Sequence, residues 1–280
     1  MTREFLHRTI FVAIVVMLLV GCSPGPAQPV APVATASPVV IVVTSLPTPT
    51  VQLNWGNPTE NKTGKTIISR ANRDTAFQTT YMIISKSGTV IVADPYRMLE
   101  GIKADVITSS HKDMDHNDAE FYAANDCRKS LYTVEKFTVK DVTVTSIASS
   151  HYTDTIDSAN PSNVIYVFDV DGLRIAHMGD IWQSSLTPEQ LQALGQVDIV
   201  FTIMEDQPYY GFTKEKTLTI LKQLNPRVVM PTHPQQPAVE AVGKSVDETL
   251  KGTVRWAVSK DDLQDGKRRL VILSPYPLEQ

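Results

Sequence analysis

The sequence predicts an α/β fold in which helices pack on a mixed β-sheet. Two observations support this prediction. Hairpin signatures dominate the first part of the chain, and helices alternate with strands in the last part. Hairpins join antiparallel neighbours, whereas strands separated by helices usually pair in parallel. With 42% hydrophobic residues, the chain can bury a proper core.

The first hairpin is expected from residues 80–85 and 89–93, which flank Lys86-Ser87-Gly88, and Asp94-Pro95 ends its second strand. A strand over Val106–Ser109 follows. Asn117 or Asp118 then caps a short helix that reaches Ala124. Short strands are expected over 137–139 and 142–148.

The second hairpin is expected from residues 164–170 and 173–178, joined by Asp171-Gly172, the strongest two-residue turn signal in the chain. Thr187-Pro188-Glu189-Gln190 then predicts a capped helix that stops at Gly195. The remaining predicted elements are a strand over 197–203, a helix over 214–224, a strand over 227–230, a helix over 239–250, and strands over 254–258 and 269–273.

Residues 1–21 are predicted to be a targeting segment. Two arginines precede the apolar run Ile10–Val20, which is shorter than the roughly 20 residues that span a bilayer. The residues Leu-Val-Gly-Cys that end at Cys22 resemble a bacterial lipobox, in which the cysteine is lipidated. We therefore expect an exported lipoprotein, anchored through Cys22 to the membrane at the cell surface or periplasmic face. The alternative is an ordinary secretory signal with an incidental cysteine.

Residues 22–60 are predicted to be a flexible linker, and residues 61–280 are the right size for one large domain or a two-layer sandwich of related halves. The stretch from Ser23 to Leu53 has no charged residue and holds seven of the 18 prolines. Val39–Val43 is prone to form a strand but is assigned to the linker. The net charge of −4 argues against a nucleic-acid partner. With Cys22 lipidated, Cys127 has no partner for an intramolecular disulfide.

The stretch Ser109 to Asp118 places four potential metal ligands within six positions, directly after a predicted strand: His111, Asp113, Asp115 and His116. Taken alone, the stretch could equally be a solvated loop. Three further potential ligands, His151, Asp180 and His233, each follow the end of a predicted strand. Because four strand ends all terminate in His or Asp, the joint pattern favours a metal site.

The order H-x-D-x-D-H, S-S-H, H-M-G-D and P-T-H resembles the metallo-β-lactamase-fold hydrolases. The resemblance runs from about Thr66 to the C-terminus. It is closest to the branch of L-ascorbate-6-phosphate lactonases and N-acyl phosphatidylethanolamine phospholipases D. It implies an αββα four-layer sandwich with the site along one edge of two sheets.

The resemblance also implies two divalent metal ions. One would be held by His111, Asp113 and His151, the other by Asp115, His116 and His233, with Asp180 bridging both. The commonest family pattern has His where this chain has Asp113. Zinc is expected, but a carboxylate there shifts the preference toward manganese or iron.

The implied activity is hydrolysis by a metal-bound hydroxide, which Asp115 orients while it also shuttles a proton. The expected substrate is a small or lipid-like molecule with an ester, lactone, amide or phosphodiester bond. Two alternatives remain open: a di-iron-type oxidoreductase, since flavodiiron proteins also have a carboxylate at the position of Asp113, and a non-catalytic lipoprotein that uses the metal site to bind a ligand.

Six further residues have two interpretations each. His177 could donate to a ligand or be an ordinary buried histidine. Asn163 and Tyr209-Tyr210 could face substrate, although an aromatic loop that only packs is the simpler expectation. Glu205-Asp206 could tune the metals or form a solvated turn, the default for two adjacent carboxylates.

Overall fold

The computed structural model describes residues 43–45, 57–73 and 78–275. The predicted targeting segment, Cys22 and most of the predicted linker lie outside these residues. Within them, no helix combines the length and apolar character needed to cross a membrane. Cys127 is half-buried and forms no disulfide with a described residue.

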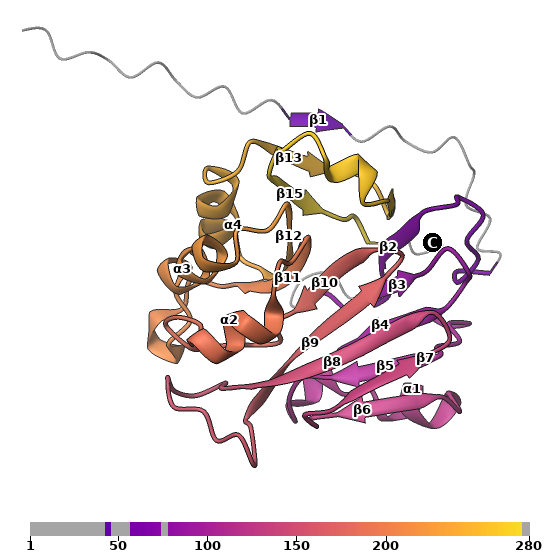
Figure 1. The fold of residues 1–280 in the computed structure, drawn as a ribbon, viewed down its shortest axis with the longest axis horizontal. Coiled ribbons are helices and arrows are strands. Elements are labelled where there is room, and N and C mark those ends of the chain that lie inside the picture. Colours follow the sequence, from indigo (N-terminus) through magenta and orange to yellow (C-terminus); the bar gives the residue numbers. More distant parts are fainter. Residues whose placement is uncertain (1–42, 46–56, 74–77, 276–280) are drawn as a thin grey trace, which may run out of the picture. The chain divides into compact units, whose positions relative to one another are not determined.

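The described strands form two mixed sheets that lie face to face (Figure 1). The larger sheet has the order β1-β13-β15-β12-β11-β10-β9-β8-β7 and the smaller sheet the order β14-β2-β3-β4-β5-β6. The strands of the larger sheet are β1 (Val43–Ser45), β7 (Lys136–Val139), β8 (Val142–Ser149), β9 (Asn163–Val170), β10 (Leu173–His177), β11 (Ile199–Met204), β12 (Val228–Pro234), β13 (Glu248–Lys251) and β15 (Arg269–Ile272). Those of the smaller sheet are β2 (Thr66–Arg70), β3 (Tyr81–Ile84), β4 (Val90–Ala93), β5 (Val106–Ser109), β6 (Arg128–Leu131) and β14 (Arg255–Val258).

Helices cover the outer faces of both sheets (Figure 1). The α-helices α2 (Pro188–Leu194), α3 (Lys214–Leu224) and α4 (Gln236–Gly243) lie on the larger sheet, and α1 (Ala119–Ala124) lies on the smaller one. Short 3-10 helices are η1 (Met114–His116), η2 (Pro208–Tyr210) and η3 (Asp261–Leu263). The result is the predicted αββα arrangement.

Three buried apolar layers separate these four layers. The central core lies between the sheets, where the rings of Tyr81 and Phe201 stack with centroids 4.3 Å apart. A second core joins α2, α3 and α4 to the larger sheet, and a third packs Phe121 of α1 against the smaller sheet. Burial of these side chains is the main force that holds the layers together.

Both predicted hairpins are confirmed, with β3 antiparallel to β4 and β9 antiparallel to β10. Asp171 and Gly172 both have positive φ, as the tightest hairpin turns require. The predicted capping box of α2 is also present, because the Thr187 side chain accepts from the Gln190 amide and the Gln190 side chain accepts from the Thr187 amide.

The prediction of one helix over residues 239–250 is wrong. The helix α4 ends at Gly243, and the Ser245 amide bonds the Val242 carbonyl just beyond that end. Residues Glu248–Lys251 instead form β13, which pairs in parallel with β15. On its other side β13 pairs with β1, a strand within the stretch predicted to be linker.

Candidate metal centre

All seven predicted ligands lie at one edge of the two facing sheets. The strand β5 of the smaller sheet leads into the loop and 3-10 helix η1 that carry four of them. From the larger sheet, His151 follows β8, Asp180 follows β10 and His233 lies near the end of β12. Four chain segments far apart in sequence are thereby brought to the same edge.

The first cluster consists of His111, Asp113 and His151, together with Asp180. Single ligand atoms of His111, His151 and Asp180 all lie within 4.8 Å of one another. Asp113 Oδ2 lies 3.6 Å from His111 Nε2 and 3.4 Å from His151 Nε2. Asp113 is therefore close enough to both histidines to complete the first cluster.

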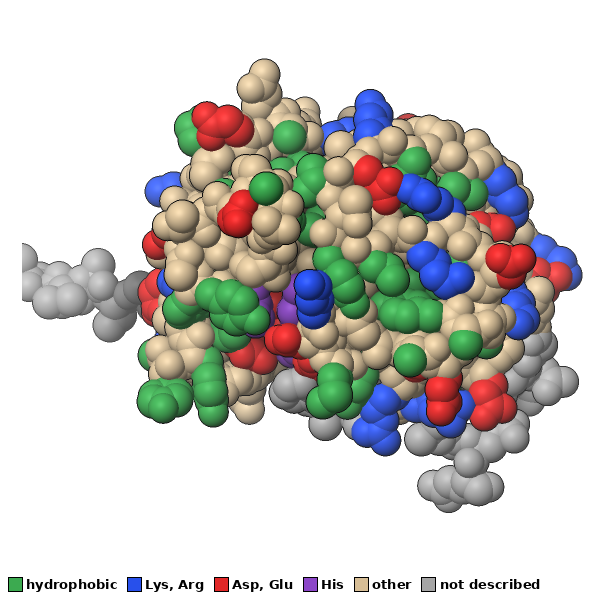
Figure 2. Space-filling view, turned by 90° about the horizontal axis from the view of Figure 1, so that it is seen from below, with side chains coloured by type: hydrophobic (Ala, Val, Ile, Leu, Met, Phe, Trp, Pro, Cys, Tyr) green, Lys and Arg blue, Asp and Glu red, His purple; other side chains and the backbone are tan. Residues whose placement is uncertain are grey.

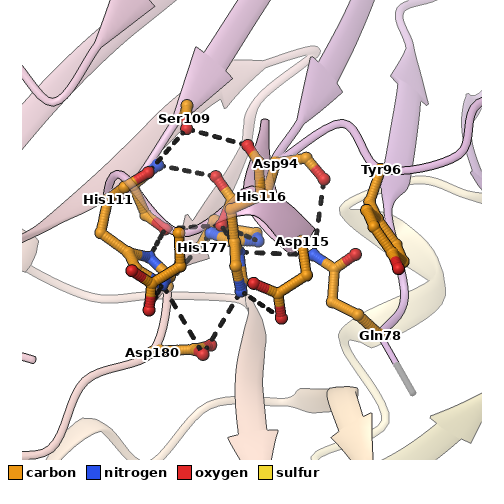
Figure 3. A network of polar contacts seen from close by, with 12 residues as sticks. Gln78, Asp94, Tyr96, Ser109, His111, Asp115, His116, His177 and Asp180 are labelled. Atoms are coloured by element: carbon orange, nitrogen blue, oxygen red, sulfur yellow. Dashed lines mark hydrogen bonds and ion pairs between the residues drawn. The ribbon is translucent and has the colours of Figure 1, made fainter. Parts of the chain in front are cut away.

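The second cluster consists of Asp115, His116 and His233, whose ligand atoms also lie within 4.8 Å of one another. Asp115 Oδ2 lies 3.6 Å from His116 Nε2. Asp180 reaches this cluster too, because its Oδ2 lies 3.3 Å from His116 Nε2 (Figure 3). Its Oδ1 lies 3.3 Å from His233 Nε2. One carboxylate thus faces both clusters, as a bridging ligand must.

In the first cluster, neutral groups hold the far side of each imidazole. His111 Nδ1 lies 2.9 Å from Ser110 Oγ, and His151 Nδ1 lies 2.9 Å from the Asp180 carbonyl oxygen. The carbonyl can only accept, so His151 carries its proton on Nδ1. The Nε2 lone pair then points into the cluster.

In the second cluster, buried carboxylates hold the far side of each imidazole. His116 Nδ1 lies 2.7 Å from Asp94 Oδ2, and His233 Nδ1 lies 3.3 Å from Glu205 Oε1. Both carboxylates are almost fully buried. A carboxylate behind a ligating histidine fixes the ring and raises the basicity of the nitrogen that binds metal.

The donor set fits a divalent metal. His111 Nε2 is buried and has no hydrogen-bond partner among the described residues. A buried polar atom in that position loses its interaction with water without replacement, which a metal ion would supply. The mixture of imidazole and carboxylate ligands suits zinc, manganese or iron.

The surroundings shift the pKa values of His111, His116 and His233 in different directions. Burial and the neighbouring His116 lower the pKa of His111 to about 4. Burial alone would also lower the pKa of His233, but Asp180 and Glu205 raise it to about 9. Burial acts in the same direction on His116, yet Asp180 and Asp94 hold its pKa well above the usual value.

Asp94 is a site residue that sequence reasoning missed, because Asp94-Pro95 served there only as the end of a strand. The carboxylate is fully buried and accepts from the Ser110 amide at 2.7 Å as well as from His116. Burial would raise its pKa, but His177 and His116 outweigh that effect and hold the pKa far below its usual range. The available signal was an acid at the end of a buried strand.

Glu205 lies opposite His233, so the expectation of a solvated Glu205-Asp206 turn is wrong for Glu205. Its Oε2 accepts from Gln207 Nε2 at 3.0 Å, which orients Oε1 toward His233. Asp206 instead pairs with Lys214 at 2.6 Å. Glu205 therefore lies behind His233, whereas Asp206 forms an ion pair with Lys214.

Asn163 supports the ligand turn and does not face substrate. It is fully buried, donates to the Met178 carbonyl at 2.9 Å and accepts from the Asp180 amide at 3.2 Å. His177 lies behind Asp94, with Nε2 3.8 Å from Asp94 Oδ2, and does not contact a ligand.

Tyr209 and Tyr210 do not pack into the core. Their side chains are 92% and 65% exposed, and they contact each other edge to face with ring centroids 5.1 Å apart. The adjacent Phe212 lies over the site, with its ring centroid 5.7 Å from that of His151.

Asn117 holds the loop of the first four ligands in shape. Its side-chain amide donates to the carbonyls of His111 and Asp113, at 2.8 Å each. Its oxygen accepts from Ser109 Oγ at 3.0 Å and from Tyr122 Oη at 2.8 Å. Asp118, and not Asn117, caps α1 by accepting from the Phe121 amide.

Comparisons with known proteins agree with this geometry. The family model described as Beta-lactamase superfamily domain matches residues 75–233. A protein from Thermotoga maritima, assigned as a Zn-dependent hydrolase of the metallo-beta-lactamase superfamily, has a similar structure. The TM-score is 0.55 at 20% sequence identity, and the match covers 74% of this chain and 98% of that one.

Two more distant structures are also similar. Igni18, a metallo hydrolase from Ignicoccus hospitalis, matches with a TM-score of 0.49 and 12% identity, over 77% of this chain and all of that one (100%). CmlA, a diiron beta-hydroxylase from Streptomyces venezuelae, matches with a TM-score of 0.48 and 10% identity, over 71% of this chain and 55% of that one. No curated protein sequence matches the chain.

Proposed function

The chain belongs to the beta-lactamase superfamily, and from this premise we propose that it is a metal-dependent hydrolase with a two-metal site. One observation carries the proposal: two ligand clusters, each with two histidines and its own aspartate, meet at the single carboxylate of Asp180. A structural zinc site needs only four closed ligands, so a shared seven-ligand set indicates catalysis.

His111, Asp113 and His151 would hold one ion, Asp115, His116 and His233 the other, and Asp180 both. When bound, two such ions supply a water of lowered pKa and a Lewis acid that polarises a carbonyl or phosphoryl oxygen. Asp115 is the more exposed of the two carboxylates in the second cluster, with 23% of its side chain exposed against 9% for Asp180, and would accept the proton of the attacking water. No protein nucleophile is required.

The bond cleaved is an ester, lactone, amide or phosphodiester in a small or lipid-like molecule. Exposed apolar side chains around the site support this substrate class. Of the five large hydrophobic side chains that are exposed among the described residues, four lie in loops that carry or adjoin ligands: Met114, Tyr152, Tyr209 and Tyr210. In Figure 2, His side chains are visible in a hollow with hydrophobic side chains on either side.

The decisive experiment combines metal analysis with a substrate panel. Protein purified without added metal should contain zinc, manganese or iron and should hydrolyse at least one member of a panel of esters, lactones, amides and phosphodiesters. Asp180→Ala and His111→Ala should abolish both metal content and turnover. Turnover by metal-free protein would refute the proposal, and oxygen-dependent turnover by a two-iron protein would replace it with the oxidoreductase.

We also propose that the protein is an exported lipoprotein held at a membrane through Cys22. The apolar run and lipobox-like residues before Cys22 support this. Expression of the full chain in a bacterium should yield protein that sediments with membranes, and Cys22→Ser should release it. If the Cys22→Ser protein sediments as the parent does, the anchor is a different one.

A further inference from the structure

A cleft of about 330 Å³ opens beside the first cluster. One of its walls is His111, and the other walls come from the loop between β8 and β9 and from Tyr132 after β6. Its lining residues are His111, Lys112, Tyr132, Tyr152, Ala159, Asn160, Pro161 and Ser162. The volume is at the lower end for ligand pockets, so the cleft suits a small group.

The lining contains one cation and no acid. Lys112 is exposed, and its ammonium forms no ion pair or hydrogen bond with any of the described residues. This is unusual in a region where Asp113 and Asp115 lie one and three positions away in the chain. In Figure 2, a basic side chain lies at the edge of the hollow that contains the His side chains.

The other polar groups of the cleft are also available as donors. The Tyr152 hydroxyl and the Asn160 side-chain amide form no hydrogen bond within the described part of the chain. By contrast, Tyr132 already donates to Asn117, and Ser162 accepts from the His151 amide at 2.9 Å. An ammonium, a phenol and an amide therefore line one small space whose lining contains no carboxylate.

Resting on the proposed hydrolase activity, we propose that this cleft binds an anionic group of the substrate, a carboxylate or a phosphate, on the side of the scissile bond that lies over the first cluster. Lys112 is then a specificity-determining residue. Charge-assisted hydrogen bonds are about twice as strong as neutral ones, and Lys recognises such anions as a point charge. The substrate class narrows to acidic esters, lactones, amides or phosphodiesters.

The test uses equilibrium binding, so it does not depend on turnover. Calorimetry on the metal-loaded full chain compares butyrate, pentanoate and hexanoate with succinate, glutarate and adipate. Each pair offers one carboxylate to the metals, and only the diacid offers a second charge to Lys112. A parallel series of ω-phosphonocarboxylates replaces that second charge with a phosphate-like group and separates the two anions.

In the parent protein, at least one diacid or phosphonocarboxylate should bind about tenfold more tightly than its matching monoacid. Lys112→Ala should remove this preference, Lys112→Glu should reverse it, and Lys112→Arg should retain most of it. Lys222→Ala is the matched control, because Lys222 is an exposed lysine on α3 outside the cleft. The Lys222→Ala protein should prefer the doubly charged ligands as strongly as the parent does.

The proposal is overturned if the parent shows no preference for any of the charged ligands, or if Lys112→Ala keeps the preference. Metal analysis of each variant accompanies the titrations, and loss of metal from Lys112→Ala would also count against a role in substrate binding. Failure of the proposed function has a different signature, since it appears as absence of hydrolysis across the panel while the binding preference is still measurable.

Discussion

Replacing Glu205 by Gln should weaken one of the two metal sites and leave the other unchanged. Glu205 is 7% exposed, and its Oε1 lies 3.3 Å from His233 Nδ1, on the side of the ring away from the metal. Gln has the same shape and can still be held by Gln207. The substitution therefore removes a charge and little else.

The expected loss is about tenfold in metal affinity for Glu205→Gln and about 100-fold for Glu205→Ala, the range found for partners of ligating histidines. Competition between protons and the metal for His233 acts in the opposite direction. Glu205 helps to raise the pKa of His233 to about 9, so its removal makes the metal-free site easier to deprotonate. The full loss of metal affinity should therefore appear only above a pH of about 9, and a smaller loss should appear at neutral pH.

The assay is competition with a chelator, which resolves two dissociation constants per chain at each pH. Asp206→Asn is the matched control, since Asp206 is the neighbouring carboxylate but pairs with Lys214 at 2.6 Å and not with a ligand. Its two constants should match those of the parent. If Glu205→Gln also matches the parent at high pH, Glu205 does not support His233.

Three other outcomes are expected. Gly179→Ala should destabilise the protein by about 1–3 kcal/mol in chemical denaturation and reduce metal affinity, because φ is +58° and an added Cβ would lie 2.3 Å from Asn163 Oδ1; parental stability would contradict this. Asp113→His should shift the metal preference toward zinc, measured by competition between zinc and manganese; an unchanged preference would show that Asp113 does not bind. The metal-free protein should lose up to about 3 kcal/mol as pH rises from about 6.5 to 9, because the raised pKa of His233 stabilises the fold only while the imidazole is protonated. Thermal melts after chelation test this, and added metal should flatten the profile.

The grouping of the candidate ligands could be predicted from the sequence because local spacing constrains their positions strongly. His111 and His116 lie in one loop directly after a strand, and His151, Asp180 and His233 each stand at or near a strand end. Since strand ends of a two-sheet sandwich meet at common edges, their assembly follows once the sheets are inferred.

The supporting carboxylates could not be predicted in the same way. Asp94 and Glu205 also stand at strand ends. The local sequence around such an acid is the same whether its carboxylate faces water or lies behind a histidine. Their roles depend on strand order: β4 is the neighbour of β5, and β11 is the neighbour of β12. That order is set by tertiary packing, which local patterns do not encode.

The strand β13 was missed for a related reason. The sequence Glu-Thr-Leu-Lys has no strong β pattern, and it follows a helix with an apolar face. Leu250 is drawn into the central core by pairing with Val271 of β15. Tertiary context therefore overrides a helical periodicity that would otherwise continue.

The two clusters differ in the groups that lie behind their histidines. This difference gives a physical reason for a carboxylate, and not a histidine, at position 113. Two carboxylates, Asp94 and Glu205, stand behind the histidines of the second cluster, while neutral groups stand behind those of the first. With a histidine in place of Asp113, the first cluster would have no carboxylate besides the shared Asp180. Asp113 restores a negative charge on the side where the cleft of Lys112 begins. Because Asp113 is half exposed at its side chain, it balances the ion without closing that side to an anionic substrate.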